Sequence, residues 1–271
     1  MIAPPLSFPM SSFYLSSVPV PISIPQDGFA SKGGNHYDAP ASVEFLQNHK
    51  DFQRWMKRTH EKFGEGFTGV RILSIYPFVN TVTTDGAGPR NVPKPIGFVW
   101  LDADIKFKGK AIPGAALIRG DAVAMLPILK AQEDPTLEFT ITTVQSRAPL
   151  GESAEQEVPA GMMDGNKNFG GVAAKEMLEE TGLTFSEAEM ECIGEMTPSG
   201  GGCDERLKLF RCVKVMPHSD ILALQGKLTG NQEEGESIAL KLWRFQDFVA
   251  ACRTSEIKDA KAKCLLFHHL V

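Results

Sequence analysis

The sequence predicts a mixed α/β (α+β) protein, and three observations lead to this fold class. Apolar residues recur at helical spacing between positions 42 and 64. Runs rich in Val, Ile and Phe follow, bounded by Gly and Pro, as strands would be. Residues 159–183 then look like the end of a strand, a loop and a helix. At 271 residues, the chain is long enough for about two domains.

Residues 1–41 differ in composition from the rest of the chain. The first 25 positions hold six Ser and six Pro, and positions 1–35 carry only Asp27 and Lys32 as charges. Prolines interrupt every apolar run that could serve as a secretory signal, and the arginines typical of a transit peptide are missing. We therefore predict a disordered or loosely packed tail over 1–41, with an organelle-targeting segment as the alternative.

An N-terminal α+β module is predicted over 42–112. Phe45, Leu46, Phe52 and Trp55 stand at helical spacing in a charged background, which predicts a helix, in one or two pieces, that ends near Gly64. The apolar runs 70–79 and 96–107 are bounded by Gly-rich and Pro-rich turns. They predict the strands of a small sheet.

A second domain is predicted over 113–271. Two strand-like runs, 115–129 and 137–144, are separated by the polar turn AQEDPT, which indicates a hairpin or meander. The segment GGVAAKEMLEETGL combines apolar anchors and Ala with a terminal Gly182. This pattern predicts a helix that ends at that glycine.

Composition excludes several classes of function. Lys and Arg number 28 against 33 Asp and Glu, and the net charge of −5 disfavours binding to nucleic acid or to an anionic membrane. No uninterrupted run of 18 apolar residues is present, so we expect a soluble protein. Five well-separated cysteines without a C-x-x-C suggest neither a disulfide framework nor a zinc site. A reducing compartment fits best: the cytoplasm, or an organelle such as a plastid, mitochondrion or glycosome.

Acidic residues concentrate between 152 and 182, where seven acids and two bases give a local net charge of −5. On the predicted helix, Glu176 and Glu180 are four residues apart and share a face. Two carboxylates at this spacing repel each other, so they favour a compensating cation, and a hard divalent metal such as Mg²⁺ suits oxygen ligands. The alternative is an acidic helix face that is simply solvated.

The string from Gly161 to Leu183 resembles the Nudix box, G-x5-E-x7-R-E-U-x-E-E-x-G-U. The glycines, the three helix glutamates and the apolar positions match, whereas Lys167 replaces the first glutamate and Lys175 replaces the arginine. The segments TTVQSRAPLG, EVPAGMMDG, PSGGGCDE and GESIALKLWRF are similar, in that order, to ADP-sugar and ADP-ribose pyrophosphatases of the plant and protist type. The similarity covers about 42–271 and implies a Nudix αβα sandwich with a mixed sheet over 113–271.

The resemblance also implies a metal site. Mg²⁺, or Mn²⁺ in its place, would be held by Glu176, Glu180, the carbonyl group of Ala160 and Glu236. Glu180 and Glu234 would be catalytic, with Glu234 as the general base on a loop that closes over the metal. For Glu234 and Glu236, the alternative is a solvated acidic loop.

Further residues are implied to support the site or to contact the substrate. Lys175 and Glu179 are expected to support the acidic cluster. Arg147 would pair with the diphosphate or, equally, form a structural salt bridge. The glycine-rich turn 198–205 would border the substrate through Gly201, Gly202 and Glu205.

These features predict metal-dependent hydrolysis of the pyrophosphate bond of a nucleoside diphosphate sugar, with ADP-sugar or ADP-ribose favoured and UDP-sugar as an alternative. Lys167 and Lys175 motivate a second alternative, a Nudix-fold binding module that has lost catalysis. A nucleoside triphosphatase of the same fold would not need the N-terminal module. The expected partner is a small nucleotide sugar, with neither nucleic acid nor membrane, and we expect a homodimer.

Overall fold

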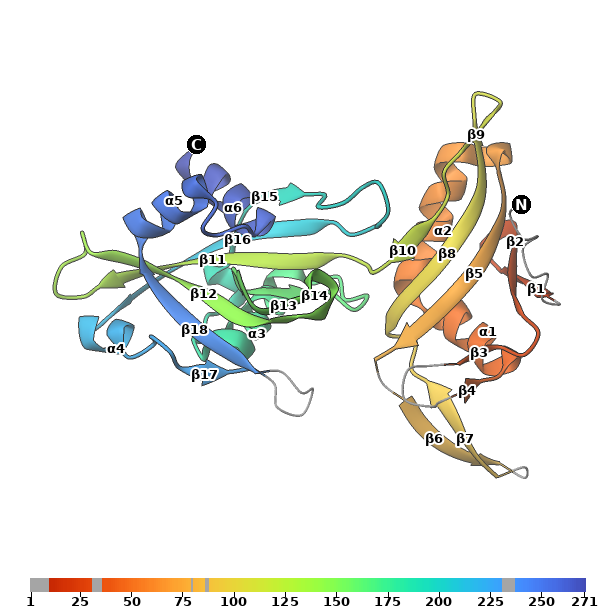
Figure 1. Cartoon of the computed structure of the whole chain (residues 1–271), viewed down its shortest axis with the longest axis horizontal. Helices are drawn as coiled ribbons and strands as arrows, with labels where there is room; N and C mark the ends of the chain where they lie inside the picture. Colours follow the sequence, from red (N-terminus) through yellow and green to blue (C-terminus); the bar gives the residue numbers. More distant parts are fainter. Residues whose placement is uncertain (1–9, 31–35, 79, 86–87, 231–236) are drawn as a thin grey trace. The chain divides into compact units, whose positions relative to one another are not determined.

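The computed structural model describes residues 10–30, 36–78, 80–85, 88–230 and 237–271 (Figure 1). The chain divides into two compact units. The N-terminal unit runs to Asp121 and includes Ser199–Glu205, whereas the C-terminal unit holds Ala122–Pro198 and Arg206–Val271. The sequence suggested a division at 112/113. The structure divides the chain later because the run 115–129 forms two strands, β10 (Ala116–Ile118) and β11 (Ala122–Ala131), which belong to different sheets.

The N-terminal unit contains a six-stranded sheet with the order β1-β2-β5-β8-β10, in which β9 also pairs with β8. Strands β2 and β5 are parallel and the other neighbours are antiparallel. The remaining strands of this sheet are β1 (Met10–Leu15), β2 (Val18–Pro25), β5 (Phe67–Pro77), β8 (Gly97–Phe107) and β9 (Lys110–Ile112). Two small hairpin pairs are β3 (Phe29–Ala30) with β4 (His36–Tyr37), and β6 (Asn80–Asp85) with β7 (Gly88–Pro93). The strands predicted at 70–79 and 96–107 are confirmed as β5 and β8.

The predicted N-terminal helix is confirmed in two pieces, α1 (Ala39–Asn48) and α2 (Lys50–Phe63), followed by the 3-10 turn η1 (Gly64–Gly66). His49 separates the two helices. Its backbone is extended, and its buried ring accepts the N–H of Phe52 on Nδ1 at 3.2 Å. Nε2 lies 2.9 Å from the carbonyl oxygen of Gly97, to which it donates. The ring therefore caps α2 and ties it to the sheet.

The prediction of a loosely packed tail over 1–41 is wrong for the residues that the structure describes there, 10–30 and 36–41. Strand β2 alternates, and its residues Val18, Val20, Ile22 and Ile24 are buried in the core of the unit. Its prolines occupy the alternate positions, where Pro19 is exposed. The register of β2 with β5 contains only Ile22 and Ser23, so the missing proline N–H groups cost this ladder little.

The C-terminal unit contains an eight-stranded mixed sheet with the order β15-β16-β11-β12-β18-β17. Strands β11 and β16 are parallel, β11 and β12 form the predicted hairpin, and the short strands β13 and β14 pair with β12 and β11. The other strands are β12 (Glu138–Arg147), β13 (Glu152–Glu157), β14 (Ala160–Met162), β15 (Glu191–Met196), β16 (Leu207–Met216), β17 (Leu228–Thr229) and β18 (Ile238–Arg244). The helices are α3 (Phe169–Thr181), α4 (His218–Leu222), α5 (Phe245–Thr254) and α6 (Ala260–Leu270), with 3-10 turns η2 (Ala148–Leu150) and η3 (Glu187–Glu189).

Helices cover both faces of this sheet (Figure 1). On one face, Val123 and Met125 of β11 share a core with Met177 of α3. On the other, Ala124 and Leu126 share a core with residues of α5 and α6. Successive residues of β11 therefore point to opposite helical layers. The αβα sandwich with a mixed sheet is confirmed.

None of the helices that the structure describes is long and apolar enough to cross a membrane. All five cysteines are free.

Candidate metal-binding site

Helix α3 carries the central part of the box and has well-defined ends. The side chain of Asn168 accepts the N–H of Gly171 at 3.1 Å and caps the first turn. Gly182 has a φ of +73° and donates its N–H to the carbonyl oxygen of Leu178 at 2.9 Å. This left-handed position favours glycine and ends the helix where the sequence predicted.

Strand β14 and helix α3 bring three of the predicted metal ligands together. The N–H of Ala160 donates to Oε2 of Glu180 at 3.0 Å, and Glu180 is buried with 5% of its surface exposed. One turn earlier, the side chain of Glu176 lies against Gly161, in the space that a Cβ atom there would occupy. Both carboxylates therefore contact the same short strand.

The carboxyl end of α3 contacts the segment that leads to the predicted acidic loop. The hydroxyl of Thr229 donates to the carbonyl oxygen of Glu180 at 2.5 Å. The N–H of Gly230 donates to the carbonyl oxygen of Glu179 at 3.2 Å. The predicted residues Glu234 and Glu236 follow within 231–236, which lie outside the described residues.

The donor set fits a hard divalent cation. Mg²⁺ prefers oxygen ligands, retains several waters and is often held by one or two carboxylates. Glu176, Glu180 and the carbonyl oxygen of Ala160 would supply such oxygens. Within the described part of the chain, no group of three or more His, Cys, Asp or Glu side chains could hold a metal ion.

The two lysines that depart from the box occupy exposed positions. Nζ of Lys175 lies 2.8 Å from Oε2 of Glu179, one turn further along α3. Lys167 precedes the helix, and its N–H donates to the side chain of Asn166 at 2.7 Å. The structure thus pairs the two residues that were predicted to support the site, Lys175 and Glu179.

Arg147 forms the salt bridge that was one of its two predicted roles. Its Nε and Nη2 atoms lie 2.7 and 2.5 Å from Oε2 of Glu157. Lys261 contacts the other oxygen of Glu157 at 3.2 Å. Burial raises the pKa of Glu157, but Lys261 and Arg147 outweigh this effect and hold the pKa below its ordinary value. The sequence does not indicate that Glu157 and Lys261 meet, because they are 104 residues apart in the chain.

The predicted substrate loop belongs to the N-terminal unit. The carbonyl oxygen of Gly202 accepts the N–H of Leu117 at 2.9 Å, and Oε1 of Glu205 lies 2.8 Å from Nε of Arg119. The buried Asp204 accepts the N–H groups of Arg119 and Gly120 at 2.8 and 3.0 Å. Gly201 is exposed. The contact of Gly201, Gly202 and Glu205 with a substrate stays a prediction.

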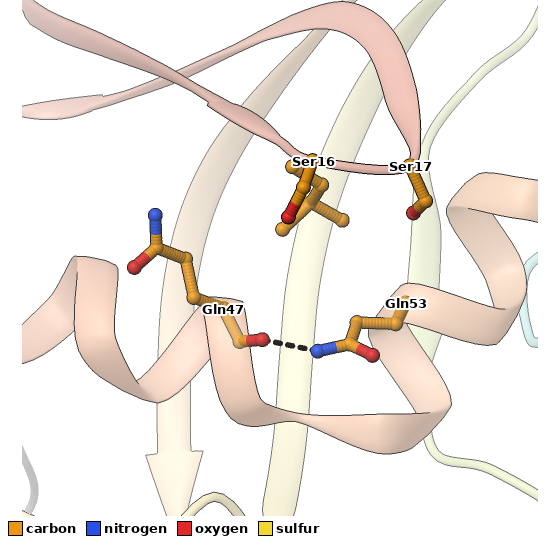
Figure 2. Close-up of a pocket in the computed structure, with 5 residues that line it drawn as sticks. Ser16, Ser17, Gln47 and Gln53 are labelled. Carbon is orange, nitrogen blue, oxygen red and sulfur yellow. Dashed lines mark hydrogen bonds between the residues drawn. The ribbon is translucent and has the colours of Figure 1, made fainter.

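A hollow in the N-terminal unit is lined by Leu15, Ser16, Ser17, Gln47 and Gln53 (Figure 2). The side-chain amide of Gln53, one of the lining residues, donates to the backbone carbonyl oxygen of Gln47 (Figure 2). None of the described residues that line the hollow is charged, so these residues do not suit a diphosphate.

One of the comparisons with known proteins agrees with the box. No family model matches the chain. Nudix hydrolase 14, chloroplastic, of Arabidopsis thaliana is 35% identical over 166 residues, which are 57% of this chain and 52% of that protein. The chain thus spans about half the length of this relative. The solved structure of an ADP compounds hydrolase is 13% identical, with a TM-score of 0.45, and the match covers 74% of this chain and 92% of that one. This second likeness is too distant to bear on function.

The fold and the site define an αβα protein in which two helix carboxylates face a short strand of the central sheet. The chain is a homologue of a Nudix hydrolase. The resemblance to the Nudix superfamily, predicted from residues 161–183, is confirmed.

Proposed function

We propose that the chain hydrolyses the pyrophosphate bond of a nucleoside diphosphate sugar, with an ADP-sugar or ADP-ribose as the favoured substrate. The products would be a nucleoside monophosphate and a sugar phosphate. The observation that carries this proposal is the placement of Glu176 and Glu180 against Ala160 and Gly161, in the order of the Nudix box. The name of the Arabidopsis relative, a Nudix hydrolase, supports it.

The residues of this site would hold the metal and fix its surroundings. When bound, Mg²⁺ or Mn²⁺ would stabilise negative charge on the phosphoryl oxygens and lower the pKa of a water molecule. Glu176, Glu180 and the carbonyl oxygen of Ala160 would be its ligands. The hydrogen bond from the N–H of Ala160 orients the buried carboxylate of Glu180 before metal binds.

Other residues complete the proposed mechanism. Glu236 is proposed as an added ligand and Glu234 as the general base that removes a proton from the attacking water. The hydrogen bonds of Thr229 and Gly230 to the end of α3 support this, because they bring the chain to the carboxylate helix just before residues 231–236. Arg147 is proposed to contact the diphosphate, in which case Lys261 would still neutralise Glu157.

Loss of catalysis is the alternative that Lys167 and Lys175 suggest. The site retains Glu176, Glu179 and Glu180, and a metal-free module would relieve their repulsion by losing one of them. Lys175 keeps a positive charge at the arginine position of the box, where it forms an ion pair with Glu179. These features favour the enzyme.

Hydrolysis of a substrate panel tests the proposal. ADP-ribose, ADP-glucose, UDP-glucose and a nucleoside triphosphate are each incubated with Mg²⁺, with Mn²⁺ and with a chelator. We expect metal-dependent release of a nucleoside monophosphate from one of the sugar nucleotides. Saturable binding of a sugar nucleotide without turnover would instead support the binding module.

We also propose a homodimer in a reducing compartment. On the face of the N-terminal sheet that points away from its core, aromatic side chains are exposed. Tyr76 is 48% exposed to solvent and Trp100 is 42% exposed. Exposed aromatic side chains are enriched at interfaces, which supports self-association through this face. Sedimentation velocity of the wild type and of Trp100→Glu tests it, since only the wild type should sediment as a dimer. The relative is named chloroplastic, which supports a plastid as the alternative to the cytoplasm.

A further inference from the structure

The first turn of α6 contacts the backbone that leads into the proposed metal site. The carboxylate of Asp259 caps this helix, because Oδ1 accepts the N–H of Lys261 at 2.9 Å. Its other oxygen, Oδ2, accepts the N–H of Val158 at 3.0 Å. One side chain therefore joins the start of α6 to a backbone group two residues before Ala160.

Lys261 makes a second connection between the same two segments. Its Nζ lies 3.0 Å from Oδ1 of Asp259 and 3.2 Å from Oε1 of Glu157. The three side chains are only 17%, 5% and 12% exposed, respectively. Burial lowers the pKa of Lys261, but Asp259 and Glu157 outweigh it and raise the pKa above its ordinary value. Water screens these largely buried ion pairs only weakly.

The segment 157–160 is hydrogen-bonded at every residue. The carbonyl oxygen of Glu157 accepts the hydroxyl of Thr143 at 3.3 Å. The N–H of Val158 donates to Asp259, and the carbonyl oxygen of Pro159 accepts the N–H of Met125 at 2.9 Å. The N–H of Ala160 then donates to the carboxylate of Glu180. Among these contacts, those of Asp259 and Lys261 come from charged side chains about a hundred residues away in the chain.

We propose that Asp259 and Lys261 are positioning residues for the metal site. By holding the side chain of Glu157 and the N–H of Val158, they set where the carbonyl group of Ala160 and the backbone of Gly161 lie relative to Glu176 and Glu180. The metal-related part of this inference rests on the proposed function. The backbone part concerns the metal-free chain and stands without it.

Amide hydrogen exchange of the metal-free full-length chain tests the backbone part. Lys261→Met and Asp259→Asn should speed the exchange of the N–H groups of Val158 and Ala160 by at least about tenfold, since these hydrogen bonds would open more often. Lys263→Met is the matched control on the same helix, because Lys263 contacts Ser255 and should leave both rates unchanged. Lys261→Arg keeps the charge and should restore most of the protection.

Titration with Mn²⁺ tests the link to the metal site. Residues that orient metal ligands typically change metal affinity by about 10–100-fold, so the Kd for Mn²⁺ should rise by that factor in Lys261→Met and Asp259→Asn. Turnover should fall while KM for the sugar nucleotide changes less than threefold. A merely structural defect would instead lower the thermal unfolding midpoint and leave the Kd of the folded protein unaltered.

Each outcome has a distinct meaning. Unchanged exchange at Val158 and Ala160 in both variants would overturn the positioning role, even in an active enzyme. Accelerated exchange with an unaltered Kd for Mn²⁺ would overturn the link to the metal. If the wild type bound no Mn²⁺, the proposed function would fail, while the exchange comparison would still decide the backbone role. Should Lys261→Met not fold, Asp259→Asn supplies the same comparison, with Lys261→Arg as the conservative variant.

Discussion

The side chain of Glu176 fills the space beside Gly161 that any other residue at position 161 would need for its Cβ atom. This relationship gives a physical reason for the first glycine of the box. Glycine at this position of β14 allows a helix carboxylate to reach the backbone of the strand. The short strand and the helix can then place their oxygens side by side.

Gly161→Ala should therefore impair the site more than the fold. A Cβ atom would meet Cγ, Cδ and Oε1 of the flexible Glu176 side chain, which would have to rotate away. Misplacement of a ligand by about 1 Å can lower a rate by about a hundredfold, so turnover should fall strongly while the unfolding midpoint changes little. Kinetics and thermal unfolding of the purified variant check this. Retained turnover would show that Glu176 does not act from this position.

Glu180→Gln tests the second carboxylate. The amide keeps the shape of the side chain but weakens metal ligation, and turnover should fall by at least about a hundredfold. Glu179→Gln is the comparison on the same helix. Its effect should be smaller, because Glu179 pairs with Lys175. Near-normal rates for Glu180→Gln at saturating Mg²⁺ would contradict the assignment.

The sequence predicted the centre of this site because its parts are local. Gly161, Glu176 and Glu180 lie on one strand-loop-helix unit, whose spacing alone brings them together. Asp259 and Lys261 were not found because their contact with 157–158 depends on the docking of α6, about a hundred residues away. Strand β2 was missed for another reason. Its Ser-rich and Pro-rich composition is typical of a disordered segment. The alternate residues Val18, Val20, Ile22 and Ile24 nevertheless face the core.

Lys167→Glu restores the glutamate of the box and tests whether the lysine weakens the site. Lys167 is exposed in the loop before α3, so the change should not disturb the fold. An added carboxylate near a cation is favourable, and metal affinity should stay the same or improve. Titration with Mn²⁺ checks this. A tenfold loss of affinity would reveal a separate role for the lysine.

Ile22→Ala tests the burial of β2. Ile22 is fully buried in the core of the N-terminal unit, and such a truncation typically costs about 2–5 kcal/mol of unfolding free energy. Tyr14→Ala is the control, because 58% of Tyr14 in β1 is exposed and its loss should cost little. Denaturant unfolding measures both. Equal stability of the two variants would contradict the burial of β2 and support a loosely packed segment.

The pH dependence of stability should reflect the contacts of Glu157 and Lys261. The pKa of Glu157 in the folded chain lies below its ordinary 4.5, so its contribution is present above pH 4.5 and is lost as the pH falls through the folded value. The pKa of Lys261 lies above its ordinary 10.5, so its contribution is present below pH 10.5 and is lost as the pH rises through the folded value. Both contributions are therefore complete between about pH 5 and pH 10.

Glu157→Gln should remove the acid-sensitive part of this profile. The variant should be less stable than the wild type at neutral pH, because it weakens two ion pairs of a largely buried group. Below pH 4.5 the two unfolding midpoints should converge, because protonation takes the same charge from the wild type. Thermal unfolding from pH 3 to pH 8 measures this, with Glu155→Gln as the control on the same strand. A constant difference between wild type and Glu157→Gln across that range would mean that Glu157 does not titrate with folding, and that its contacts with Lys261 and Arg147 do not set the acid limit of stability.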